Sequence, residues 1–89
     1  MVRILVRFVG RPYNMTNKRE VWLHFSDCDK VTFKDLLNRL EVEIGVKFNV
    51  GRGGIIALIN GRNVDHIGGL NADLKDQDEV TIASIAGGG

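Results

Sequence analysis

The residues best suited to chemistry stand at the C-terminus, where the sequence ends in Ile85-Ala86-Gly87-Gly88-Gly89. Glycine has no side chain to pack and loses the most conformational freedom when it is ordered. We therefore predict a mobile tail at 86–89 that projects from the last strand and carries the carboxylate of Gly89 at its tip. Extended, this tail reaches roughly 13 Å, which suits entry into another protein's active site. A frayed terminus without a role is the alternative.

The other chemically active side chains do not combine into a catalytic group. Cys28 lies between Asp27 and Asp29, whose negative charges disfavour the thiolate, so we expect an unreactive cysteine. His24 and His66 have no apparent partners in the sequence and are expected to be ordinary solvated histidines. No Cys/His cluster has the spacing of a metal site. The sequence therefore predicts a chain that is not an enzyme and binds no metal or cofactor itself.

Glycines also gather in the segment 45–54, GVKFNVGRGG, which invites comparison with a phosphate-binding loop. The pattern G-x-x-x-x-G-K-[ST] is absent, and these glycines precede a strand instead of linking a strand to a helix. The segment is therefore predicted to be a flexible connection, in preference to a nucleotide site.

Composition restricts the class of protein further. The 89 residues suit one domain, and the 12 basic and 11 acidic residues leave a formal net charge of +1. This balance argues against a broad phosphate-binding face, so no nucleic-acid partner is expected. No apolar run approaches the length of a membrane span, and the N-terminus shows no signal-peptide pattern. A cytoplasmic protein without a membrane partner is predicted.

The tail needs a folded body, and the periodicity of apolar residues predicts its elements. Strands are expected at 2–8, 20–25, 55–59, 62–64 and 80–85, with Asn60-Gly61 as a hairpin turn. A helix is predicted at 33–44, where five apolar residues share one face. Thr32 is placed as its N-cap, with Asp35 three residues on, and Gly45 is placed to end it. The segment 10–18 is expected to be a turn-rich connection, and 65–73 to be turn-like with one tight helical turn.

One amphipathic helix and one sheet with a single apolar face bury those faces against each other. We predict an α+β, β-grasp (ubiquitin-like) fold: a mixed four- to five-stranded sheet on one main helix, with the first and last strands paired at its centre. The domain is predicted at 1–85, followed by the tail at 86–89. The second sheet face is expected to be open to water and to carry Arg3, Leu5, Arg7, Trp22, His24, Ile56, Leu58, Ala83 and Ile85.

Several motifs give the chain a family resemblance. They are T-F-K-D-L-L at 32–37, N-G-R at 60–62, L-K-D-Q-D-E-V at 74–80 and the terminal glycines. Together they resemble the MoaD/ThiS ubiquitin-like sulfur carriers and the small archaeal modifier proteins. The chain has Gln77 where the family commonly has glycine, and three terminal glycines where members usually have two. Gly89 is therefore the expected working terminus, with trimming to Gly88 as the alternative.

The resemblance implies that the terminal carboxylate is activated inside a partner. In such proteins the carboxylate attacks the α-phosphate of ATP in a MoeB/ThiF-like or ubiquitin-activating-like enzyme, and a persulfide sulfur then displaces AMP to leave a thiocarboxylate. ATP and magnesium belong to the partner. The sulfur would go to molybdopterin, to thiamine thiazole or to tRNA through a synthase or thiolation enzyme. The alternatives are a modifier joined to target-protein lysines and a β-grasp interaction module with an inert tail.

The predicted body must supply most of the docking affinity, because ordering four tail residues costs roughly 1–2 kcal/mol each. We expect the open sheet face to be the partner-binding surface. Its expected residues are Leu5, Leu58, Ala83 and Ile85, with Arg7 and Arg62 as a polar rim.

Overall fold

The computed structural model describes residues 1–26 and 30–85, and its main feature is a five-stranded sheet with strand order β2-β1-β7-β4-β5. A short ribbon of β3 and β6 lies beside it. The elements in chain order are β1 (Val2–Val9), α1 (Arg11–Thr16), β2 (Glu20–Phe25), β3 (Val31–Thr32), α2 (Phe33–Ile44), β4 (Ile55–Ile59), β5 (Arg62–Asn63), two 3₁₀ turns (Val64–His66 and Gly69–Asn71), β6 (Asp73–Leu74) and β7 (Glu79–Ser84).

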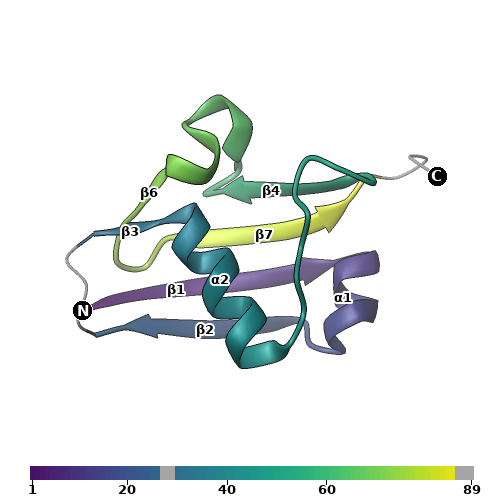
Figure 1. The fold of residues 1–89 in the computed structure, drawn as a ribbon, viewed down its shortest axis with the longest axis horizontal. Coiled ribbons are helices and arrows are strands. Elements are labelled where there is room, and N and C mark those ends of the chain that lie inside the picture. The colour runs from purple at the N-terminus through teal and green to yellow at the C-terminus, as the bar shows by residue number, and fades with distance from the viewer. Residues whose placement is uncertain (27–29, 86–89) are drawn as a thin grey trace.

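The predicted central strand pair is confirmed. β1 and β7 run parallel, with Val6 opposite Val80 and Phe8 opposite Ile82. The other pairings of the main sheet are antiparallel, so the sheet is mixed (Figure 1). Because the two strands are parallel, the start of β1 and the end of β7 lie at opposite ends of the sheet.

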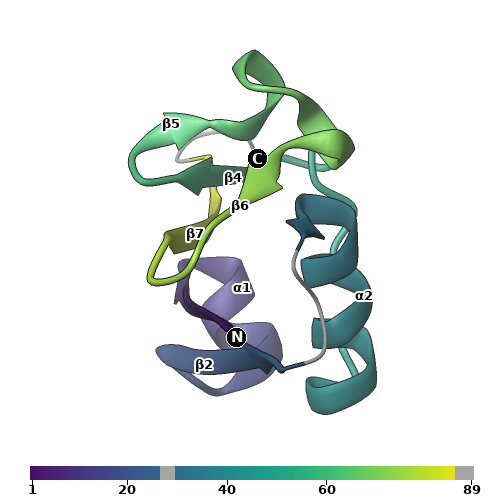
Figure 2. The same cartoon turned by 90° about the vertical axis from the view of Figure 1, so that its left-hand side faces the viewer.

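The sheet and α2 form two layers with the core between them (Figure 2). Alternation sends every second residue of the strands toward α2. The buried side chains of this layer include Ile4, Val6, Phe8, Leu23, Phe33, Leu36, Leu40, Phe48, Ala57, Ile59, Val80 and Ile82. The α+β, β-grasp prediction with one main helix is therefore confirmed.

The predicted helix boundaries hold because their capping groups form. The Asp35 amide donates to the Thr32 hydroxyl oxygen at 3.2 Å, and the Thr32 amide donates to the Asp35 carboxylate at 3.0 Å. These two bonds satisfy donors at the helix start. Gly45, at a φ of 81°, ends the helix in the left-handed conformation that glycine adopts without strain.

The prediction of a turn-rich connection at 10–18 is wrong, because the structure has the six-residue helix α1 there. Pro12 falls in the first helical turn, where its missing N–H removes no bond, and the Thr16 hydroxyl donates to the Pro12 carbonyl at 3.1 Å. The predicted return strand is shorter than 62–64, since Val64 begins a 3₁₀ turn with its side chain buried. The segment 65–73 contains parts of two such turns where one was expected.

Candidate functional site

The candidate reactive residues at the C-terminus lie outside the part of the chain that the structure describes. This applies to Ala86, Gly87, Gly88 and Gly89, and also to Cys28. The structure does describe the residues from which the tail begins, Ser84 and Ile85.

The root of the tail is fixed on both sides. Ser84 pairs with Ile55 of β4, and the Ile85 amide donates to the Gly54 carbonyl at 2.8 Å. From the other side, the Arg11 amide donates to the Ser84 hydroxyl oxygen at 3.2 Å. The chain is therefore held by hydrogen bonds up to the last residue before the tail.

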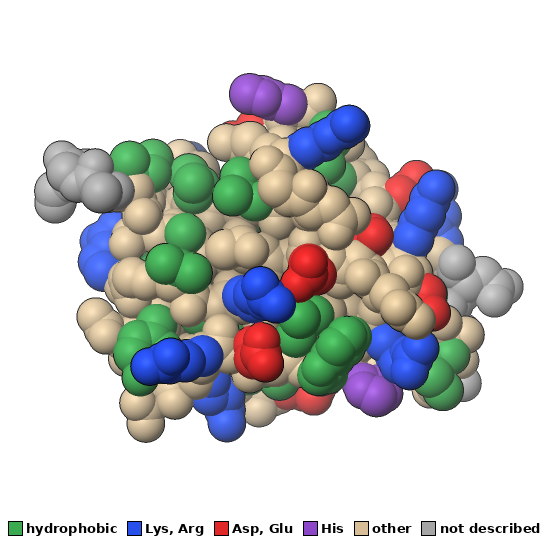
Figure 3. Space-filling view, turned by 180° about the vertical axis from the view of Figure 1, so that it is seen from behind, with side chains coloured by type: hydrophobic (Ala, Val, Ile, Leu, Met, Phe, Trp, Pro, Cys, Tyr) green, Lys and Arg blue, Asp and Glu red, His purple; other side chains and the backbone are tan. Residues whose placement is uncertain are grey.

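Apolar side chains gather around this root on the sheet face opposite α2 (Figure 3). Cross-strand pairing places Val9, Ala83 and Ile56 in one row across β1, β7 and β4. Leu58 lies opposite Thr81 in the next row, on the same face. Val9 and Ile85 are each about half exposed, at 53% and 51%. We call Val9, Ile56, Leu58, Ala83 and Ile85 the tail-end patch.

Charged residues border the tail-end patch on one side. Arg7 pairs with Glu79 at 3.0 Å and with Glu20 at 3.6 Å, and all three are about half exposed. Arg7 also lies opposite Thr81 on the open face. It therefore occupies the predicted rim position, with its charge already balanced by two carboxylates.

Two other residues of the predicted surface are placed differently from the expectation. Leu5 lies on the open face between Trp22 and Glu79 of the neighbouring strands, but it is only 8% exposed and offers little area to a partner. Arg62 lies opposite Ile59, a core residue. Directly paired residues share a face, so Arg62 belongs to the α2 side and not to the open face. In β5 it is Asn63, opposite Leu58, that lies on the open face.

Val9 is a member of the patch that the sequence interpretation did not select. The signal was present, because the alternation of Leu5 and Arg7 continues to Val9 if the strand is one residue longer than predicted. The structure extends β1 to that residue.

The turn before β7 is held by its acidic residues. Asp78 accepts from the Lys75 amide at 2.8 Å and from the Asn60 side chain at 2.9 Å. The Asn60 side chain in turn accepts from the Glu79 amide at 2.9 Å. These bonds tie the L-K-D-Q-D-E-V segment to the hairpin at Asn60-Gly61 and set where β7 begins.

Asp76 attaches the same turn to β1. Its carboxylate accepts from the Arg3 amide at 2.9 Å and lies 3.6 Å from the Arg3 guanidinium. The amide hydrogen bond, and after it the arginine charge, hold the pKa of Asp76 below its ordinary value of 3.8. Asp76 is therefore ionised at neutral pH and serves a structural role at the end of the sheet opposite the tail.

Across 1–26 and 30–85, no three or more His, Cys, Asp or Glu side chains are grouped to hold a metal ion. Within those ranges, no helix is long and apolar enough to cross a membrane.

Comparison with models of protein families shows to which family the chain is related. The model of the ThiS family matches residues 6–89, which is nearly the whole chain and includes the terminal glycines. The chain belongs to the ThiS family. This family comprises ubiquitin-like β-grasp sulfur carriers and modifiers, so the predicted family is confirmed. Comparison with curated protein sequences gives no match.

Solved structures agree with the family in fold. The solution structure of small archaeal modifier protein 1 from Methanosarcina acetivorans is 28% identical, with a TM-score of 0.76 over 100% of this chain and 98% of that one. A molybdopterin converting factor subunit 1 from Pyrococcus furiosus is 16% identical, with a TM-score of 0.75 over 94% and 98% of the two chains. A chain of the BexX/CysO complex from Amycolatopsis orientalis is 22% identical, with a TM-score of 0.71 over 97% and 99%.

Proposed function

We propose that this ThiS-family chain is a sulfur carrier whose C-terminal glycine is adenylated by a ubiquitin-activating-type enzyme and converted to a thiocarboxylate. The observation that carries the proposal is the family match, because it extends over the tail to residue 89. The strand that leads into the tail, β7, is paired along both of its edges, with β1 and with β4. The chain is the substrate of the enzyme and supplies no catalytic group.

The proposed chemistry occurs at the terminal carbon. A carboxylate oxygen attacks the α-phosphorus of ATP, pyrophosphate leaves, and an acyl-adenylate forms. A persulfide sulfur of the partner then attacks the acyl carbon and AMP leaves; attack of a second thiol on the sulfur–sulfur bond releases the thiocarboxylate. ATP, magnesium and the persulfide cysteine belong to the partner. Glycine suits these steps because no Cβ obstructs a narrow channel or the approach of the backbone to phosphate. The sulfur would serve molybdopterin, thiazole or tRNA thiolation.

The tail-end patch is the surface that we propose docks against the adenylating enzyme. It surrounds the root of the tail, so an enzyme that covers it also receives the terminal glycines. Apolar side chains at the centre and charged groups at the edge are the usual arrangement of a protein interface. Compared with the surface expected from sequence, Val9 and Ile56 are added, while Leu5 and Arg62 contribute little.

The test uses the purified chain, its cognate adenylating enzyme and ATP. Pyrophosphate exchange measures adenylation, and the intact mass of the chain from native cells shows a sulfur-for-oxygen exchange at the terminus. A variant that lacks Gly88 and Gly89 is expected to lose both signals. Normal exchange with that variant, or native chain without sulfur under conditions that load other carriers, would contradict the proposal.

The docking surface has a matched pair of variants. Leu58→Arg places a charge in the tail-end patch and is expected to reduce the rate of adenylation at least tenfold. Val42→Arg makes the same chemical change on the exposed side of α2, away from the sheet, and should leave the rate unchanged. Equal rates for the two variants would show that the enzyme docks elsewhere.

A modifier role is the second candidate, and it is supported by the likeness to small archaeal modifier protein 1. In that role the activated glycine forms an isopeptide bond with a lysine of a target protein. The last tryptic site of this chain is Lys75, so tryptic digests of native cells would then contain target lysines that carry the peptide 76–89 as a remnant. These modified lysines would disappear when the gene for this chain is deleted. An interaction module with an inert tail is left if neither sulfur nor remnants are found.

A further inference from the structure

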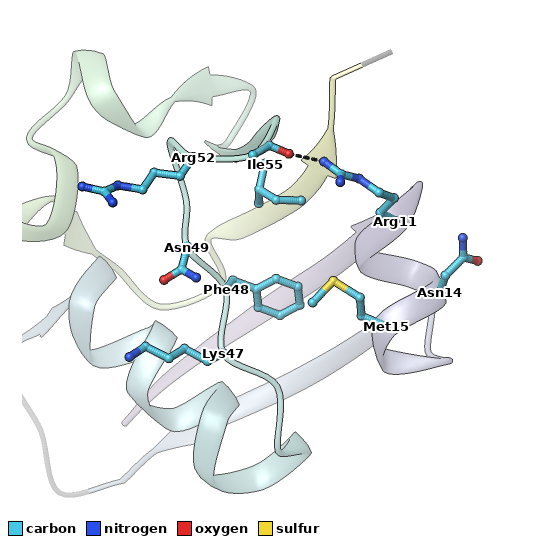
Figure 4. A pocket seen from close by; sticks show the side chains of 9 residues that line it. Arg11, Asn14, Met15, Lys47, Phe48, Asn49, Arg52 and Ile55 are labelled. Atoms are coloured by element: carbon cyan, nitrogen blue, oxygen red, sulfur yellow. Dashed lines mark hydrogen bonds between the residues drawn. The ribbon is translucent and has the colours of Figure 1, made fainter. Parts of the chain in front are cut away.

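A second feature lies beside the tail root, on the side of the sheet that faces α2. A pocket of about 470 Å³ opens between α1 and the loop that connects α2 to β4. In Figure 4 the side chains of Phe48 and Met15 point toward one another across it, with Ile55 beside them. Ile55 pairs with Ser84 at the end of β7. The pocket and the tail-end patch therefore lie on opposite faces of the same end of the sheet.

The floor of the pocket is part of the core. Phe48 is 5% exposed and stacks on Phe8, with 5.7 Å between the ring centroids and 20° between the ring planes. Met15 comes from α1 and is 50% exposed, although its side chain is apolar. A flexible thioether at the mouth of an apolar pocket adapts to the shape of an inserted group. The floor is rigid and the wall is adaptable.

The charges around this pocket are of one sign. Its lining contains Arg11, Lys47 and Arg52 and no acidic residue. None of these three forms an ion pair with a carboxylate of the residues that the structure describes, whereas Arg3 and Arg7 on the sheet are paired. This pocket therefore carries positive charge that nothing in the described fold neutralises.

Arg11 is the cation best prepared to bind. Its guanidinium donates to the Gly53 carbonyl across the top of the pocket (Figure 4), which fixes its direction and leaves further N–H donors free. Lys47 and Arg52 extend from the other side of the loop (Figure 4). They are exposed and add positive charge to the lining of the pocket.

We propose that this pocket binds an acidic segment of a partner protein, with an aromatic or leucine side chain inserted between Phe48 and Met15 and a neighbouring carboxylate paired with Arg11. An arginine that is already held by one hydrogen bond can donate to a carboxylate with little further loss of side-chain freedom. The inserted side chain covers apolar area that is now in contact with water. The site differs from the tail-end patch in face and in charge, and it requires no chemistry at the tail.

A protein segment fits this site better than a small aromatic acid does. The apolar lining consists of three side chains, Phe48, Met15 and Ile55. A free small molecule would therefore keep much of its surface in water, whereas small-molecule sites usually bury most of the ligand. A partner segment can continue from the inserted group over the basic loop, where Lys47 and Arg52 extend from the other side (Figure 4).

The experiment measures peptide binding to the full-length, isotope-labelled chain by nuclear magnetic resonance. The probe is an acetylated pentapeptide with a central phenylalanine and two acidic residues on each side. We expect millimolar binding, with amide shifts concentrated at 11–15 and 47–55. Replacing the central phenylalanine by glycine, or the acidic residues by lysine, should abolish those shifts. Absence of shifts at millimolar peptide, or equal binding of the glycine peptide, would overturn the proposal.

Two double variants with the same change in net charge distinguish binding at the pocket from a general electrostatic attraction between the protein and the peptide. The double variant Lys47→Glu with Arg52→Glu should lower the affinity for the acidic peptide by about tenfold. The double variant Arg62→Glu with Lys75→Glu changes exposed residues outside the pocket lining, and it should alter the affinity for the same peptide less than about twofold. The spectra of both variants report whether the fold is retained, and Arg11→Gln provides a single-residue change if either double variant unfolds. Equal weakening by the two doubles would overturn the proposal, as would tighter binding of 3-phenylpropionate than of the peptide.

Discussion

Gln77 is the residue whose replacement by glycine should stabilise the protein. It is the third residue of the turn that the Asp78 amide closes on the Lys75 carbonyl at 3.0 Å, and its φ is +70°. Turns with a positive φ at this position favour glycine. Glycine would therefore fit the backbone conformation at this position better than glutamine does.

The magnitude follows from two opposing terms. A non-glycine residue in the left-handed region loses roughly 1–2 kcal/mol to the contact of its Cβ with the backbone. Introducing glycine costs about 0.4–1 kcal/mol, because it increases the freedom of the unfolded chain. No side-chain hydrogen bond of Gln77 is found among the described residues, so no further term is lost. The two ranges leave a net gain of about 0.8 kcal/mol at their midpoints, with limits of about 0 and 1.6 kcal/mol. Gln77→Gly should therefore raise the free energy of unfolding by about 0.8 kcal/mol, or the melting temperature by about 3–6 °C.

Urea denaturation of Gln77→Gly and of a control measures this effect. The control is Lys75→Gly in the same turn, because Lys75 is exposed and does not have a positive φ. The control should lose about 0.5–1 kcal/mol, since only the entropic term applies. The two variants should have the same m-value as the parent, which shows that the difference lies in stability and not in compactness. If Gln77→Gly loses as much stability as the control, the strain argument is refuted.

Three further predictions concern the rest of the body. Gly10→Ala should lower the free energy of unfolding by about 2 kcal/mol or more, because the φ of Gly10 is +73° and an added Cβ would clash with the Ser84 hydroxyl. Gly45→Ala is the control, since Gly45 has open space around it, and it should lose less stability in the same denaturation assay. Thr32→Ala removes the helix cap and should cost about 1 kcal/mol in unfolding free energy, and a smaller loss in calorimetry would show that the capping bonds are redundant. The lowered pKa of Asp76 stabilises the folded state above the ordinary value of 3.8, and this contribution disappears as the pH falls through the folded-state pKa; the melting temperatures of the parent and of Asp76→Asn should therefore differ at neutral pH and converge in acid.

The elements with a strong periodic pattern were predictable from sequence. The apolar alternation of β1 and the heptad-like spacing of α2 each mark a single buried face, and burial is what fixes these elements in the fold. The parallel centre of the sheet followed from placing the two most regular strands together. The capping box at Thr32 and Asp35 was visible because it depends on neighbours three residues apart.

The features that sequence reasoning missed depend on contacts between distant residues. α1 has one turn and a half and contains Pro12, so a local pattern gives no reason to prefer a helix over a turn. Phe48 lies in an aperiodic loop, and its burial depends on Phe8, forty residues earlier. The face of Arg62 depends on the register of a two-residue strand, which a shift of one position reverses. The pocket at α1 could not be predicted because both of its walls belong to these segments.

The parallel pairing of β1 with β7 also has a mechanical consequence. A pull that separates the start of β1 from the end of β7 acts along both strands, so the hydrogen bonds between them share the load instead of opening one after another. Traction on the chain end beyond Ser84 would move the body as one rigid piece before it unravelled any strand. An unfolding enzyme that pulls on that end would meet its greatest resistance at the start, when β7 has to separate from β1.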